Sequence, residues 1–136
     1  EKDEKEKNLR KVLNLGHTFA HAYESSLNFS QKLNHGEAVI FGIRNAIKFS
    51  YNINLIKKNK FQLIKKHIDK IEIKKKFKSL FKTKDLTKII KFMKIDKKNI
   101  SNNINVILIK DFGKIVTNYH VSEKKLKKFL FLELKK

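Results

Sequence analysis

Apolar and small side chains recur about every 3.6 residues in four segments, the spacing of an amphipathic α-helix. Two of these segments are long, Asn8 to about Leu27 and Gly36 to about Asn52. A third helix, more exposed and lysine-covered, is predicted over residues 61–68. A fourth is predicted from Asp85 to Lys94, with Thr83 as its candidate N-cap.

The pattern changes after the fourth helix. Asn105–Ile109 and Lys114–Thr117 are short runs rich in β-branched residues, and Gly113 between them can supply a turn. Ser122, followed by an acidic residue, predicts the N-cap of a last helix. The lysine-rich stretch Lys74–Lys84 is expected to be a surface loop or a short solvated helix. The predicted fold class is therefore mainly α, with one small β-hairpin.

The formal net charge of +20 is carried almost entirely by lysine, since Arg10 and Arg44 are the only arginines. A basic surface attracts phosphates and nucleic acid. These lysines are spread along the chain after Lys57, however, and do not form one stripe. The chain also lacks the aromatic and basic pattern of an RNA-binding sheet. A bias toward AT-rich codons explains the abundance of Lys, Asn, Ile and Phe better, so nucleic acid is not an expected partner.

The absence of cysteine excludes disulfides and thiolate metal sites and favours a cytoplasmic location. No apolar run approaches the roughly 20 residues that a membrane helix needs. The first seven residues are all charged, which is not the start of a signal peptide. We therefore expect no membrane association.

Three of the five histidines fall within the first 35 residues. Because His17 and His21 are four residues apart, a helix would place both imidazoles on one face, with Cβ atoms about 5–6 Å apart. This arrangement suits a metal ligand or a ligand beside a base, but it also occurs in ordinary helices. Gly16 costs about 1 kcal/mol relative to Ala inside a helix, which indicates that something approaches the backbone there closely.

His35 follows an asparagine and begins the second long helix. The positive end of a helix favours the neutral imidazole that a metal requires, although an ordinary first-turn residue is the simpler interpretation. Glu37 is interpreted as a first-turn residue rather than a ligand. Arg10 and Asn14 share the face of His17 and offer a guanidinium and an amide to an anionic, hydroxyl-rich ligand. A surface ion pair with Glu6 is the alternative for Arg10.

Together these pieces resemble the 3-dehydroquinate synthase family in order and spacing. The specific parts are Asp3–Glu6, Leu9-Arg10, the run Leu13-Asn-Leu-Gly-His-Thr-Phe-Ala-His-Ala22, and His35-Gly-Glu-Ala-Val39 with Gly42. The later element Met93-Lys-Ile-Asp-Lys-Lys98 also resembles the family. The resemblance covers essentially the whole chain, although the lysine-rich middle is not specific.

The resemblance implies roles for individual residues. His17 and His35 are expected to be two metal ligands, with zinc or cobalt as the metal. His21 is expected to contact substrate and take part in proton transfer, and Glu6 to act as a general base.

The resemblance also implies substrate-binding positions. These are Arg10, Asn14 and one of Lys97 and Lys98. The implied substrate is 3-deoxy-D-arabino-heptulosonate 7-phosphate. In the reaction that the resemblance implies, NAD transiently oxidises a ring hydroxyl, phosphate is eliminated, and the ketone is reduced. Ring opening and an aldol step would then give 3-dehydroquinate, an intermediate of the shikimate pathway. The resemblance also suggests that the protein is a homodimer.

Several features depart from the family. Ala20 stands where the family usually has glycine, and the hairpin lacks the proline often found there. The Rossmann-like NAD-binding lobe, a glutamate metal ligand and another substrate lysine lie upstream of Glu1 in the family pattern. Residues 1–136 are thus expected to be a C-terminal domain, as a fragment or a decayed remnant, and inactive by themselves. The alternatives are a related sugar-phosphate cyclase, a basic nucleic-acid-binding helical module and a purely structural remnant.

Overall fold

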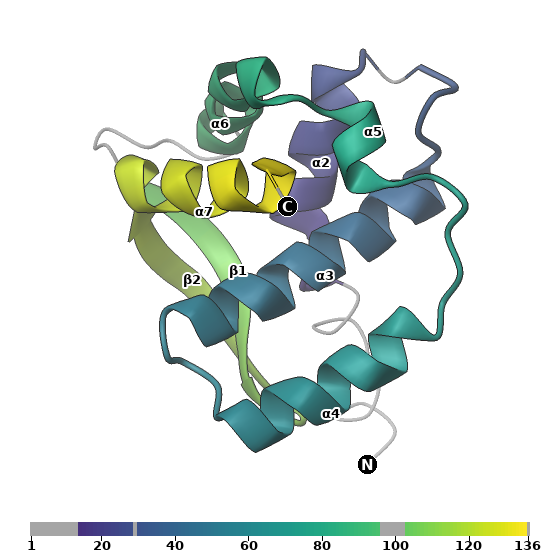
Figure 1. Ribbon diagram of the computed structural model, residues 1–136. Helices are drawn as coiled ribbons and strands as arrows, with labels where there is room; N and C mark the ends of the chain where they lie inside the picture. Colours follow the sequence, from purple (N-terminus) through teal and green to yellow (C-terminus); the bar gives the residue numbers. More distant parts are fainter. Residues whose placement is uncertain (1–13, 29, 96–102, 136) are drawn as a thin grey trace.

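The structure is a computed structural model that describes residues 14–28, 30–95 and 103–135. Its helices and strands are α2 (His17–Ser26), α3 (His35–Asn52), α4 (Lys58–Asp69), α5 (Phe77–Leu80), the 3-10 helix η1 (Thr83–Asp85), α6 (Leu86–Ile95), β1 (Asn103–Asp111), β2 (Lys114–Ser122) and α7 (Glu123–Lys135). α3 runs through the middle, with α4 on one side and α2, α6 and α7 on the other (Figure 1). The prediction of a mainly helical fold with one hairpin is confirmed.

The backbones of α2 and α3 touch where Gly16 meets Gly42. A Cβ atom on Gly42 would lie 2.2 Å from the carbonyl oxygen of Gly16, and one on Gly16 would lie 2.4 Å from the amide nitrogen of Ile43. Real Cβ atoms essentially never come this close to other atoms. The expected close approach to Gly16 is therefore confirmed, and its cause is the neighbouring helix.

The prediction of one helix from Asn8 to Leu27 is wrong within the described residues. Asn14 is helical, but Leu15 and Gly16 form a turn, and α2 begins at His17. Gly16 is the N-cap of α2, with φ −98° and ψ 2°. The apolar period continues through the turn, so periodicity alone could not reveal the break. Because Gly16 is not inside a helix, the penalty inferred from the sequence does not apply to it.

α3 begins with a reciprocal cap. The Oδ1 atom of Asn34 accepts a hydrogen bond from the amide of Glu37 at 2.8 Å, and Oε1 of Glu37 accepts one from the amide of Asn34 at 3.0 Å. These bonds satisfy two of the amide groups that a helix start leaves without partners. They also fix the backbone of His35, the first residue of α3. The apolar period placed this start at Gly36, one residue too late, whereas the expectation that His35 begins the helix is confirmed.

The lysine-rich stretch contributes to the core, which the sequence did not predict. The ring centroid of the fully buried Tyr23 lies 5.0 Å from that of Phe77 and 5.3 Å from that of Phe81. α5 and η1 hold these rings in place while the intervening lysines face outward. Thr83 is part of η1 and makes no capping hydrogen bond, so its predicted role is wrong. The carboxylate of Asp85 accepts instead from the amide of Lys82 at 2.8 Å.

The hairpin is antiparallel and extends further than its β-branched runs predicted, from Asn103 to Ser122. Gly113 occupies its turn with φ +70°, as expected for this glycine. A bulge in β2 places Asn118 at φ +56°. At the other end, Ser122 Oγ accepts a hydrogen bond from the amide of Lys125 at 3.2 Å, which confirms the predicted cap of α7.

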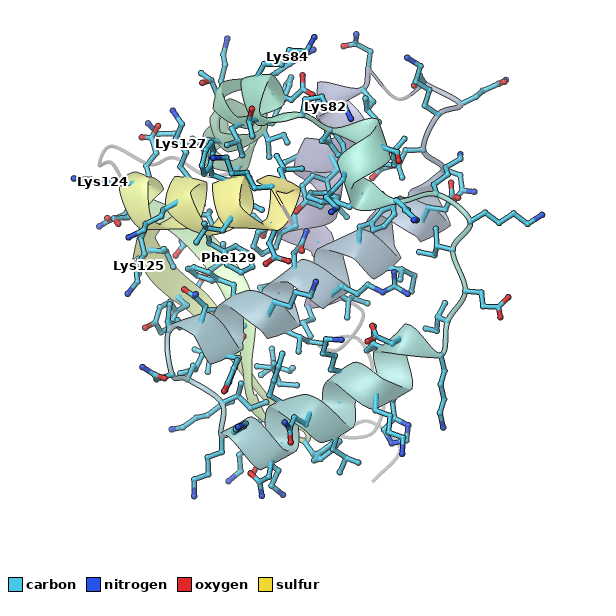
Figure 2. The ribbon with its side chains drawn as sticks, in the orientation of Figure 1. Lys82, Lys84, Lys124, Lys125, Lys127 and Phe129 are labelled. Atoms are coloured by element: carbon cyan, nitrogen blue, oxygen red, sulfur yellow. The ribbon has the colours of Figure 1, made fainter. Side chains whose placement is uncertain are left out.

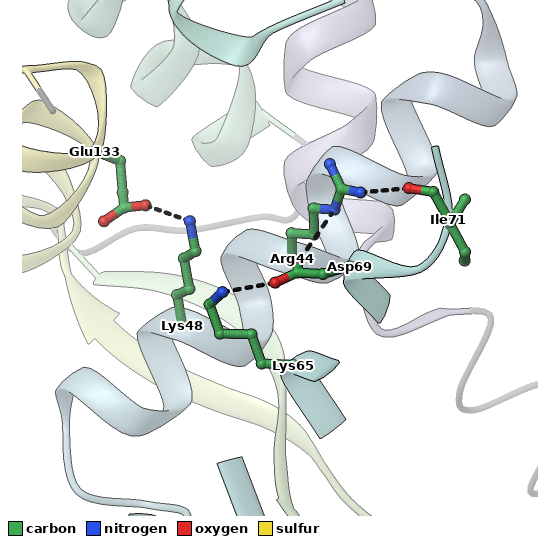
Figure 3. A network of polar contacts seen from close by, with 6 residues as sticks. All are labelled: Arg44, Lys48, Lys65, Asp69, Ile71 and Glu133. Atoms are coloured by element: carbon green, nitrogen blue, oxygen red, sulfur yellow. Dashed lines mark hydrogen bonds and ion pairs between the residues drawn. The ribbon is translucent and has the colours of Figure 1, made fainter. Parts of the chain in front are cut away.

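Polar contacts connect α3 to its neighbours (Figure 3). Lys48 donates to Glu133 of α7 at 3.0 Å, and Nη2 of Arg44 donates to the carbonyl oxygen of Ile71 after α4 at 2.7 Å. Only 8% of the Glu133 side chain is exposed, so this carboxylate depends on its partners. The seryl Oγ of the buried Ser50 accepts from the amide of Ile109 in β1 at 3.1 Å. α3 is therefore fixed on three sides.

Lysines cover the outside of the described structure. Lys84 in η1 and Lys124, Lys125 and Lys127 on α7, labelled in Figure 2, are exposed. This distribution agrees with a generally basic surface. None of the helices in the described ranges is long and apolar enough to cross a membrane.

Candidate metal and substrate site

One face of α2 forms the floor of a cleft. His17, His21 and Glu24 follow one another at spacings of four and three residues, which places them on the same side of the helix. The opposite face buries Phe19 and Tyr23 in the core. Core packing of the apolar face therefore directs the histidine face outward, where His17 and His21 are exposed.

The cleft has a volume of ≈ 390 Å³ and is lined by residues of α2, the start of α3 and β1. Asn14, His17, His21 and His35 all line it. The sequence analysis singled out these four as site residues, and the fold brings them together from separate segments. The contact between Gly16 and Gly42 holds α2 against α3 directly beside this cleft.

His35 contacts Glu24 across the cleft. Its Nδ1 atom lies 3.2 Å from both carboxylate oxygens of Glu24. The Glu24 side chain is only 14% exposed, whereas that of His35 is 72% exposed. Glu24 was not among the predicted site residues, although it lies on the histidine face of α2. Its position two turns after His17 was the signal that could have identified it.

The donor set partly fits a divalent metal. Imidazole nitrogens suit zinc and cobalt, and a carboxylate on the second ring nitrogen of a ligand is usual in such sites. Among the described residues, no three His, Asp or Glu side chains come together as a metal-binding group. The described residues alone therefore do not form a complete site, and a divalent metal would need a further ligand beside the two expected histidines, His17 and His35.

Glu37 has a structural role in this site. Its carboxylate caps α3 and also accepts from Nζ of Lys75 at 3.1 Å. The hydrogen bond with the Asn34 backbone, and then Lys75, hold the pKa of Glu37 below its ordinary value. This agrees with the interpretation of Glu37 as a first-turn residue.

Behind the cleft, in the core, burial raises the pKa of the Tyr23 hydroxyl, which accepts a hydrogen bond from Nδ2 of Asn45 at 2.6 Å.

Four predicted site residues lie outside the described residues. They are Glu6, Arg10, Lys97 and Lys98. Their assignments as general base and substrate-binding groups stay predictions.

Comparison with known proteins gives a consistent family. The family described as "3-dehydroquinate synthase C-terminal" matches residues 1–99. The chain is 44% identical to a 3-dehydroquinate synthase of Pelagibacter ubique (strain HTCC1062) over 136 residues, covering all of this chain and 37% of that protein. It is 41% identical to one of Endomicrobium trichonymphae over 120 residues, covering 88% of this chain and 32% of the relative. The chain thus spans about a third of the length of these curated relatives.

The fold is also similar to a solved structure. A crystal structure of 2-deoxy-scyllo-inosose synthase complexed with carbaglucose-6-phosphate, NAD+ and Co2+ aligns with a TM-score of 0.62 and 22% sequence identity. The alignment covers 88% of this chain and 32% of that one. At this identity the similarity concerns the fold, whereas the family match covers most of this sequence. The chain belongs to the 3-dehydroquinate synthase C-terminal family.

Proposed function

We propose that this chain is the metal- and substrate-binding lobe of a 3-dehydroquinate synthase. The reaction converts 3-deoxy-D-arabino-heptulosonate 7-phosphate to 3-dehydroquinate and phosphate, in the shikimate pathway to chorismate and the aromatic amino acids. One observation carries the proposal. Asn14, His17, His21 and His35, the family-type residues within the described ranges, line a single cleft in a chain of this family.

In this proposal His17 and His35 hold a divalent metal, zinc or cobalt. When bound there, such a metal would polarise a substrate hydroxyl and lower its pKa, which would favour its oxidation. In this proposal an N-terminal lobe would bind NAD and contribute a further metal ligand. The chain spans about a third of the length of its relatives, which leaves room for such a lobe in the complete protein.

The remaining residues bind substrate and move protons. His21, one helical turn from His17, exchanges protons with the substrate, and Glu6 is the general base. Asn14 offers its amide to a substrate hydroxyl, while Arg10 and one of Lys97 and Lys98 neutralise its carboxylate or phosphate. The enzyme would act in the cytoplasm as a homodimer.

Two other functions are distinguishable. A related sugar-phosphate cyclase would share the metal histidines but release a cyclitol. The similarity to 2-deoxy-scyllo-inosose synthase shows that such a cyclase has the same fold. The identities of 41–44% to 3-dehydroquinate synthases favour dehydroquinate. A nucleic-acid-binding module would use the outward lysines of η1 and α7 (Figure 2), and its affinity would fall steeply with salt.

The test uses the complete gene product. Phosphate release from the heptulosonate phosphate is followed with NAD and zinc or cobalt, beside a sample treated with a chelator, and the organic product is identified. Release that requires both NAD and metal and yields dehydroquinate is the expected result. A different cyclic product would move the protein to a sister cyclase, and absence of release would contradict the proposed enzyme.

A further inference from the structure

We propose that Glu24 is a positioning residue that holds the imidazole of His35 through Nδ1 and leaves Nε2 as the nitrogen that meets a divalent metal. The inference rests on the proposed function, because it concerns the same cleft. It assigns Glu24 the role of orienting the His35 ring in the proposed metal site.

The geometry fixes both ends of His35. Its backbone begins α3 and is held by the reciprocal cap between Asn34 and Glu37, at 2.8 and 3.0 Å. Its ring meets both oxygens of Glu24 at 3.2 Å. An exposed histidine at a helix start would otherwise sample several rotamers, since 72% of its side chain contacts solvent. Glu24 therefore selects one orientation of the ring.

The contact also selects a tautomer. A carboxylate accepts hydrogen bonds but does not donate them, so Nδ1 of His35 must carry the proton in this pair. In a neutral imidazole the lone pair then lies on Nε2, which is the form that binds a metal ion.

The low exposure of the Glu24 side chain distinguishes this contact from a pair of two fully exposed side chains. Exposed ion pairs hold their partners loosely and contribute little to stability. Glu24, with a side chain only 14% exposed, is held on α2 beside a tightly packed stretch of core. Its helix is fixed against α3 by the contact between Gly16 and Gly42. The carboxylate is consequently pre-positioned before any metal binds.

The experiment measures metal affinity and the tautomer of His35 in the complete gene product. Zn²⁺ affinity is obtained by chelator competition for the wild type, Glu24→Ala, Glu24→Gln and His35→Ala, with Glu72→Gln as a control at an exposed acidic residue. Nitrogen NMR of histidine-labelled, metal-free protein reports which ring nitrogen of His35 carries the proton. Because Glu24→Gln preserves side-chain size, it tests the role of Glu24 even if Glu24→Ala does not fold.

The expected result is a Zn²⁺ affinity about 10- to 100-fold weaker in Glu24→Ala, the range measured for losing such a supporting group. Glu24→Gln should weaken binding less, Glu72→Gln should match the wild type, and the His35 proton should move from Nδ1 toward Nε2 when Glu24 is replaced. Unchanged affinity and tautomer in both Glu24 variants, with binding weakened by His35→Ala, would overturn the inference but not the proposed function. Loss as complete as in His35→Ala would make Glu24 a ligand and also overturn it. Absence of Zn²⁺ binding by the wild type would overturn both.

Discussion

Replacing Gly42 by alanine should destabilise the protein and disturb the cleft together. The new methyl group would lie 2.2 Å from the carbonyl oxygen of Gly16, whereas ordinary contacts begin at 3.4 Å. Relief of this overlap requires α2 and α3 to separate by about 1.2 Å, the difference between these two distances. Both surfaces are backbone, so no side chain can rotate away.

The magnitude follows from two opposing effects. Overpacking in a close-packed interior costs about 1–3 kcal/mol, and the rigid backbone contact favours the upper end. Alanine in place of glycine inside α3 returns about 1 kcal/mol of helix propensity. The free energy of unfolding should therefore fall by about 2 kcal/mol in Gly42→Ala. The separation of the helices should also weaken Zn²⁺ binding, because His17 and His35 are on different helices.

Urea unfolding of the complete gene product, followed by circular dichroism, measures the first effect, and chelator competition measures the second. Gly36→Ala is the matched control, because it also lies in α3 and its new Cβ would meet only Oδ1 of Asn34, at 3.5 Å. This control should be neutral or slightly stabilising. If Gly42→Ala is as stable as Gly36→Ala and binds Zn²⁺ like the wild type, the contact between α2 and α3 does not hold the site together.

Other substitutions test the contact between α3 and β1, the cap of α3 and the expected metal ligand. Ser50→Ala leaves the buried amide of Ile109 without its hydrogen bond and should lower the free energy of unfolding by about 1–3 kcal/mol in urea titrations; an unchanged midpoint would contradict that bond. Because the pKa of Glu37 is lowered from 4.5, its carboxylate stabilises the fold fully above about pH 4.5 and loses this effect as the pH falls through the lower folded value. The stability difference between the wild type and Glu37→Gln should thus shrink in acid, and a difference that grows there would refute the sign. His17→Ala should abolish metal-dependent turnover while His67→Ala, at an exposed position on α4, stays near wild type; equal turnover would contradict the ligand assignment.

The sequence carried enough information for the fold class and for much of the cleft. Helical periodicity identified α3 and α4, and Gly113 and Ser122 identified the hairpin turn and the cap of α7. These features depend on residues close together in the chain. The spacing of His17 and His21 likewise specified a shared helix face, which the structure places in the cleft.

The features that sequence reasoning missed depend on contacts between distant segments. The break before α2 lies where α3 approaches Gly16, a contact that a periodic pattern does not record. The pairing of Glu24 with His35 exists only because these two helices cross as they do. The burial of Phe81 and the packing of Phe77 against Tyr23 were hidden by the neighbouring lysines, whose charges dominate the local composition.

The most direct test of the central claim is the location of a bound metal. Crystals of the complete gene product grown with Co²⁺ should give an anomalous diffraction peak in the cleft, within coordination distance of His17 and of Nε2 of His35. The same crystals of His17→Ala should lose that peak or show it weakened. A cobalt peak bound elsewhere, with the cleft histidines uncoordinated, would contradict the assignment of this lobe as the metal site of a 3-dehydroquinate synthase.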